Sequence, residues 1–276
     1  MSRELDELLA LTATLVPGLE GRVEDPVEER FESGFRSPAQ RAADRRAAAP
    51  DGGPPASGIR PGADNAAAIR DLRDWWLERH PEAGPHYLAL RCWGLLIWQP
   101  VYLGMIAAHR SAIAPDLGRL DQPVVNGFIC GYSIGRHDPL RGCLRQRMDA
   151  IAAQLRQICA AFYRELTQVL SLNPRAAACM QADCVLSALL AARSGEPAAA
   201  NAWARETAAD WLARLGIAGR SGYLAYQRDG LPVIAVDRQV CCHHFRRRDG
   251  DYCSTCPKLD TAERIARLDA ESAVAA

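Results

Sequence analysis

Residues 241–257, CCHHFRRRDGDYCSTCP, are the stretch around which the rest of the chain is organised. Its four thiols form two pairs, Cys241 with Cys242 and Cys253 with Cys256. Asp249 and Gly250, between the pairs, are typical of a tight turn, so the segment is predicted to fold back and bring the second pair beside the first. Four sulfurs that converge on one point usually bind a metal.

The spacing of the thiols leaves the kind of metal open. Tetrahedral thiolate sites serve both zinc and iron–sulfur centres. Neighbouring side chains on a strand point to opposite faces, so Cys241 and Cys242 can share a site only if the backbone kinks there. A two-iron cluster is wider than one ion and gives adjacent sulfurs more freedom to reach different irons. Four unrelated thiols are disfavoured, because a CxxC beside a turn is a recognised ligand arrangement.

Length and charge set the wider limits. A chain of 276 residues suggests one domain or one and a half. Lys plus Arg and Asp plus Glu cancel at 33 each, so no chain-wide basic field predicts a nucleic acid partner. The first seven residues, MSRELDE, carry acids where a secretory signal carries positive charge. We therefore expect a cytoplasmic protein.

The uncharged run at residues 92–108 raises the question of a membrane span. It is at the short limit for spanning, which takes about 17 to 25 residues, and it is interrupted by Gln99 and Pro100. A buried core helix, kinked near the proline, explains it better, because lipid could not satisfy the carbonyl that proline frees. We predict no membrane span; this leaves peripheral association with a membrane open.

Six further cysteines are scattered without CxxC spacing. In a reducing compartment they do not indicate a disulfide framework, and we predict that they are packing thiols. They are Cys92, Cys130, Cys143, Cys159, Cys179 and Cys184.

Composition divides the chain into four parts. Residues 1–36 are predicted to form an N-terminal helical segment whose first helix is capped by Ser2 and stopped by Pro17-Gly18. Residues 37–64, rich in Ala, Arg, Pro and Gly, have little to bury and are predicted to be a linker or loop. Residues 65–220 form a helical body, and residues 221–276 a hairpin with the metal-binding segment.

Apolar spacing by threes and fours predicts the helices of the body. They are expected at residues 65–80, 92–108, 144–169, 174–195 and 197–215. The run at 144–169 has the clearest periodicity and is predicted to be the central core helix.

Strand signals are fewer. Residues 124–134 suggest one or two strands, and residues 223–228 and 231–236 are joined by Asp229-Gly230, a strong hairpin signal. A last helix is expected at residues 261–268. The fold class is therefore α+β: a mainly helical domain with a small antiparallel sheet and a C-terminal cysteine hairpin.

The terminal pattern resembles a known family. Two adjacent cysteines, ten residues, then CxxC, with Pro257 after and Arg238 before, are similar to the C-terminal signature of the FhuF-type ferric-siderophore reductases. The resemblance implies a [2Fe-2S] cluster held by Cys241, Cys242, Cys253 and Cys256. Residues 86–100, HYLALRCWGLLIWQP, also resemble the upstream region of some members.

Several positively charged side chains lie close to the cysteines in the sequence. Arg238, His244 and Arg248 are candidates for tuning the cluster or docking a substrate or donor, since cationic neighbours favour the reduced cluster and attract anions. The same charges are also typical of a solvated basic turn balanced by Asp249 and Asp251.

The resemblance implies reduction of a ferric siderophore to release ferrous iron. No GxGxxG, phosphate loop, GxSxG or HExxH is present, so electrons are expected from an external flavoprotein or ferredoxin. No general acid, base or nucleophile is required for such a reaction. Two other classes stay open: a zinc-stapled interaction protein, and a ferredoxin-like electron carrier without its own substrate.

Overall fold

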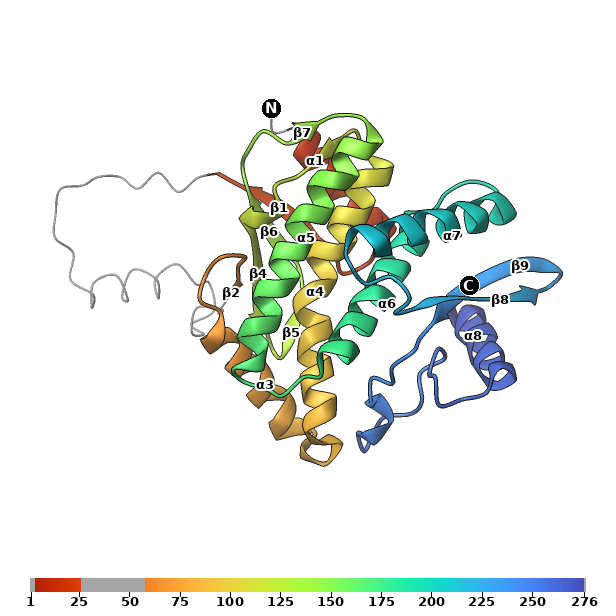
Figure 1. The fold of residues 1–276 in the computed structure, drawn as a ribbon. Helices are drawn as coiled ribbons and strands as arrows, with labels where there is room; N and C mark the ends of the chain where they lie inside the picture. The colour runs from red at the N-terminus through yellow and green to blue at the C-terminus, as the bar shows by residue number, and fades with distance from the viewer. Residues whose placement is uncertain (1–2, 26–57, 276) are drawn as a thin grey trace.

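The computed structural model describes residues 3–25 and 58–275 (Figure 1). Its helices are α1 (Arg3–Leu15), α3 (Ala66–Arg79), α4 (Gly84–Arg110), α5 (Leu144–Thr167), α6 (Pro174–Ala192), α7 (Pro197–Arg214) and α8 (Thr261–Ala275). Its strands are β1 (Gly21–Glu24), β2 (Gly58–Ile59), β3 (Ile113–Ala114), β4 (Leu120–Val125), β5 (Phe128–Ile129), β6 (Tyr132–Gly135), β7 (Leu140–Arg141), β8 (Gly222–Arg228) and β9 (Leu231–Asp237). Short 3-10 turns lie at Pro81–Ala83, Leu117–Arg119 and His244–Arg246. The predicted α+β class is confirmed.

The central helix is α4. Of its 27 residues 18 are buried, against 8 of 24 in α5, and it packs against α3, α5 and α6. The helix predicted at residues 144–169 is confirmed as α5, but it covers one side of α4 instead of occupying the centre (Figure 1). The prediction of the central helix was wrong because a helix that is buried on all sides has no polar face, and its sequence therefore shows no clear hydrophobic period.

The main sheet has the order β1-β6-β4-β2, with β5 paired to β4. β1 runs parallel to β6, a pairing that the sequence did not predict, and the other pairs are antiparallel. Leu5 and Leu8 of α1 are buried in the same core as α4, so residues 3–25 pack into the helical body. Ser2 and most of the predicted linker lie outside the described residues.

The hairpin β8–β9 confirms the Asp229-Gly230 signal. The strands pair in antiparallel register from Gly222 opposite Asp237 to the turn, where Asp229 and Gly230 have φ of 50° and 77°. Positive φ at both central residues is the condition for the turn that matches the twist of paired strands. β9 then leads directly into the cysteine segment, and the hairpin packs against α6 and α7.

In the part of the chain that the structure describes, α6 is the one helix long and apolar enough to cross a membrane. However, 56% of the relevant window is buried inside the protein. The uncharged run at residues 92–108 lies within α4 and is the buried core helix that was predicted; the helix continues beyond Pro100 to Arg110.

The prediction of packing thiols holds for only some of the six cysteines. Cys92, Cys159 and Cys179 are buried and Cys184 is half-buried. The prediction is wrong for Cys130 and Cys143, which are exposed. Both stand at ends of elements: Cys130 directly follows β5, and Cys143 caps α5, where its side chain takes part in a capping box.

Gly104 allows the close approach of α4 to α5. A Cβ built there would lie 2.8 Å from Cγ2 of Ile151, inside van der Waals contact. We therefore expect Gly104→Val to lower the free energy of unfolding by about 1–3 kcal/mol in urea titrations, the usual cost of overpacking a core. Gly94→Ala in the same helix is the control, because its Cβ would meet Met180 at an ordinary 3.5 Å. Equal stability of the two variants would show that the helices do not pack this closely.

Candidate metal centre and adjoining cavity

The backbone bends where the two adjacent cysteines stand. After β9 ends at Asp237, the chain has no regular structure through His243, and His243 has a left-handed φ of 60°. This is the kink that Cys241 and Cys242 need to direct their side chains to one site. A second turn follows, in which the Gly250 amide donates to the Arg247 carbonyl at 3.0 Å.

The predicted turn at Asp249-Gly250 is therefore present, but the glycine serves a different purpose from the expected one. Gly250 is not among the residues with positive φ. A Cβ at this position would lie 2.2 Å from the His244 carbonyl oxygen, so the close approach of two backbone segments excludes any side chain.

The four thiols lie as two pairs. The sulfurs of Cys241 and Cys256 are 3.9 Å apart, and the Cys253 thiol hydrogen-bonds to Cys242. That hydrogen bond, helped by the charge of Arg238, lowers the pKa of Cys242 below its ordinary value. The backbone amide of His243 donates to the Cys241 sulfur at 3.4 Å.

These pairs fit a two-iron cluster. Two thiolates on one tetrahedral metal ion, with bonds of about 2.3 Å, are about 3.8 Å apart, close to the spacing of Cys241 and Cys256. Each iron of a four-cysteine [2Fe-2S] cluster takes two sulfurs, so two pairs are the required donor set. In the described residues no three His, Cys, Asp or Glu side chains are gathered as ligands of a single ion.

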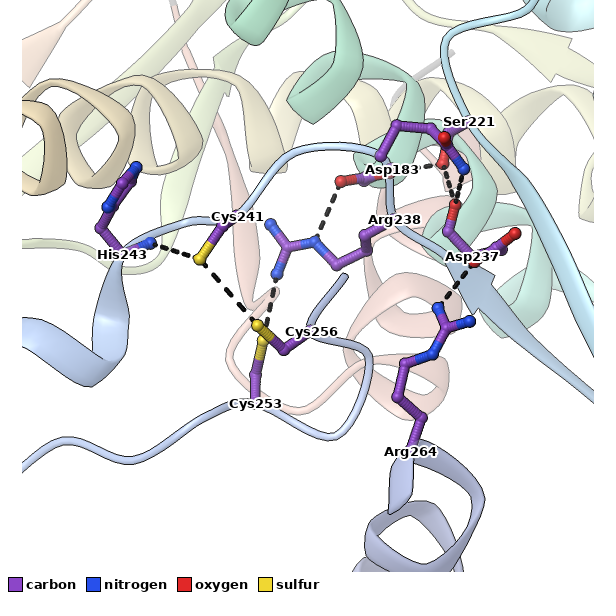
Figure 2. A network of polar contacts seen from close by, with 10 residues as sticks. Asp183, Ser221, Asp237, Arg238, Cys241, His243, Cys253, Cys256 and Arg264 are labelled. Atoms are coloured by element: carbon purple, nitrogen blue, oxygen red, sulfur yellow. Dashed lines mark hydrogen bonds and ion pairs between the residues drawn. The ribbon is translucent and has the colours of Figure 1, made fainter. Parts of the chain in front are cut away.

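Arg238 links the cysteine pairs to the helical body (Figure 2). Its Nη1 approaches the Cys253 sulfur at 3.7 Å, and its Nε donates to Asp183 of α6 at 3.0 Å. Asp183 also accepts from the Ser221 hydroxyl. Burial alone would lower the pKa of Arg238, but the negative charges of Asp183 and the cysteines outweigh it and raise the pKa.

The cysteine segment is also held from two other sides. Arg264 of α8 donates to Asp237 at 2.7 Å, as Figure 2 shows, and Arg267 donates to the Tyr252 carbonyl at 2.8 Å. At the opposite end, the Arg248 amide donates to Glu82, beside the start of α4, at 2.8 Å. The segment is therefore fixed between the hairpin, α8 and the body.

A cavity of about 440 Å³ lies between this segment and the helical body. α4 contributes Arg91 and Trp98 to its wall, β5 contributes Phe128, and the cysteine segment contributes Cys242. The rest of the wall is mainly apolar. The volume of the cavity is within the range of about 300–1,000 Å³ that is usual for small-molecule sites. One of the four cysteines thus borders a space large enough for a ligand.

The candidate docking residues separate into two groups. Arg238 and His244 line the cavity. The exposed Arg248 does not, and Arg247 is paired with Asp249 as the solvated-turn interpretation expects. Asp251, however, pairs with Arg267 of α8 instead of with an arginine of the turn.

Sequence reasoning missed two residues that the structure places here. Asp183 and Arg91 come from helices α6 and α4, remote in sequence from the cysteines. Each is the lone charge within an apolar helical run, a signal that could have drawn attention to them.

We expect Asp183→Ala to be strongly destabilising. It leaves the guanidinium of Arg238, whose side chain is 16% exposed, without its carboxylate, and breaking a buried ion pair costs about 3–5 kcal/mol. Asp269→Ala is the matched control, because Asp269 pairs with Arg228 at the surface, where such pairs contribute less than about 1 kcal/mol. Urea unfolding of both variants checks this; similar losses would mean that the Arg238 pair is no more important than a surface pair.

Comparison with known families identifies the cysteine segment. Residues 238–258 match the model of the FhuF 2Fe-2S C-terminal domain, a range that begins at Arg238 and contains all four cysteines. The further similarity expected at residues 86–100 lies outside the matched range. No solved structure matches the chain significantly. Residues 238–258 are therefore similar to the FhuF 2Fe-2S C-terminal domain, and this segment is the part of the chain to which a [2Fe-2S] cluster belongs.

Proposed function

We propose that the protein is a ferric-siderophore reductase. The observation that carries the proposal is the position of Cys242, which is at once a cysteine of the cluster segment and part of the wall of the 440 Å³ cavity. A chelate in that cavity contacts a cluster ligand directly, with no intervening side chain to cross. The FhuF-type segment supports a connection with siderophore iron.

The bound cluster supplies a site that accepts and gives up one electron at a time. One electron leaves an external donor, a flavoprotein or a ferredoxin, and Fe(III) in the chelate becomes Fe(II). Oxygen chelators hold Fe(II) far less well, so the iron is released without breaking a bond of the chelator. No proton transfer to or from a side chain is needed.

The chain itself has three tasks in this scheme. The cavity binds the chelate in contact with Cys242. Arg238 donates to the Cys253 sulfur, which stabilises the more negative, reduced state. Asp183 holds Arg238 in that position. We further propose that this reaction takes place in the cytoplasm.

We expect Ser in place of any one of Cys241, Cys242, Cys253 and Cys256 to reduce iron and acid-labile sulfide by at least about tenfold, because a hydroxyl is a poor substitute for a thiolate ligand. Visible absorbance after anaerobic purification and the rate of Fe(II) capture from a ferric siderophore should fall together. Cys143→Ser is the control: this thiol is exposed and lies outside residues 238–258, so iron content and rate should not change.

Three results would contradict the proposal in different ways. Retention of iron and colour in all four Ser variants would exclude these cysteines as ligands. A colourless protein with one zinc and no sulfide would indicate a zinc-stapled interaction protein. A coloured protein that accepts electrons but releases no iron from ferric siderophores would indicate an electron carrier.

A further inference from the structure

Arg91 is an unusual charge in the cavity wall. It extends from the buried helix α4, and its guanidinium carbon lies 4.3 Å from the centre of the Trp76 ring and 5.3 Å from that of Phe128. Its Nε is buried and has no hydrogen-bond partner. Burial lowers the pKa of Arg91, because the charged form loses water.

The neighbouring guanidinium groups are neutralised, whereas that of Arg91 is not. Arg238 is paired with Asp183, and Arg247 with Asp249. Among the described residues no carboxylate pairs with Arg91. A buried charge is costly unless it is paired, so this guanidinium favours an anionic partner that the chain does not itself provide.

The remaining wall of the cavity indicates the shape of that partner. Trp98 and Phe128 contribute aromatic rings, and Leu90, Leu95 and Met180 contribute apolar surface. Aromatic rings and a planar guanidinium both stack well on flat π systems. A carboxylate or phenolate at the edge of such a ring could accept two parallel hydrogen bonds from Arg91.

We propose that the cavity binds the planar aryl anion of a ferric chelate, a catecholate or hydroxybenzoate group, with its negative oxygens toward Arg91 and its ring between the aromatic side chains. This substrate class rests on the reductase function proposed above. The aryl oxygens that face Arg91 also ligate iron, so binding brings Fe(III) into the cavity that Arg91 and Cys242 both line. The electron balance is unchanged: the donor loses one electron and Fe(III) gains it.

A competing role for Arg91 is to offset the negative charge of the cluster. Burial lowers the pKa of Arg91, and the charge of Cys242 partly opposes this, so the two groups do interact. In that role Arg91 would influence the reduction potential of the cluster but not the binding of a ligand. The two roles are separated by measuring binding without electron transfer.

The test uses a gallium chelate, since Ga(III) has the charge and size of Fe(III) but is not reduced. Titration calorimetry of the cluster-loaded protein with gallium tris(2,3-dihydroxybenzoate) is expected to give an affinity at least about tenfold weaker in Arg91→Gln than in the unmodified protein. Arg91→Lys should be intermediate, because it keeps the charge but loses the planar fork. Arg145→Gln, whose side chain is 85% exposed, should bind as the unmodified protein does.

A second variant tests the cavity independently, in case Arg91→Gln does not fold. Phe128, 36% exposed at the cavity, can be changed to Leu while the charge of Arg91 is kept, and a severalfold loss of affinity is expected. Visible absorbance confirms that each variant retains its cluster.

Equal gallium-chelate binding by Arg91→Gln and the unmodified protein would overturn the inference, as would stronger binding of a neutral gallium trihydroxamate. Either result is distinct from failure of the reductase function. If the protein reduces a neutral ferric trihydroxamate but does not bind the aryl anion, the function stands and this substrate class is wrong. If it binds the aryl anion but reduces no ferric chelate, the aryl-anion site stands and the reductase function is wrong.

Discussion

The arrangement of the site depends on the guanidinium of Arg238. It contacts Asp183 on α6 on one side and the Cys253 sulfur on the other, and so joins the cysteine segment to the core of the helical body. Buried polar contacts of this kind fix one geometry because the alternatives leave a charge unpaired. With Arg238 in place, the cysteine segment closes one side of the cavity and Cys242 becomes part of its wall.

Another part of the cavity wall depends on α4. A helix with 18 buried residues among 27 is surrounded by α3, α5 and α6, and such a support is rigid enough to hold Arg91 and Trp98 in fixed positions. The cluster segment and the proposed binding site are thus built by different parts of the chain. Residues 238–258 supply the sulfurs, and the helical body supplies most of the surface that a ligand would contact.

Local signals in the sequence predicted local structure well. The positive-φ turn at Asp229-Gly230 depends on two adjacent residues and is present in the structure. The cysteine pattern likewise identified the cluster segment. Each of these features depends on neighbouring residues alone, which a single sequence displays.

Features that depend on distant residues were not predictable. The parallel pairing of β1 with β6 joins segments more than a hundred residues apart, and the cavity requires α4, β5 and the cysteine segment together. Asp183 becomes part of the site only through its contact with Arg238, 55 residues later. Without knowledge of which helix lies behind the cysteines, a lone acid in an apolar helix has no assigned role.

A single-turnover experiment tests the central claim, that the cluster and the cavity form one reducing site. The anaerobic protein is reduced by one electron, freed of excess reductant and mixed in a stopped-flow instrument with a ferric siderophore and a ferrous trap. The account predicts that the cluster reoxidises as Fe(II) appears, with one Fe(II) per cluster. A cluster that stays reduced beside an intact ferric chelate would contradict it.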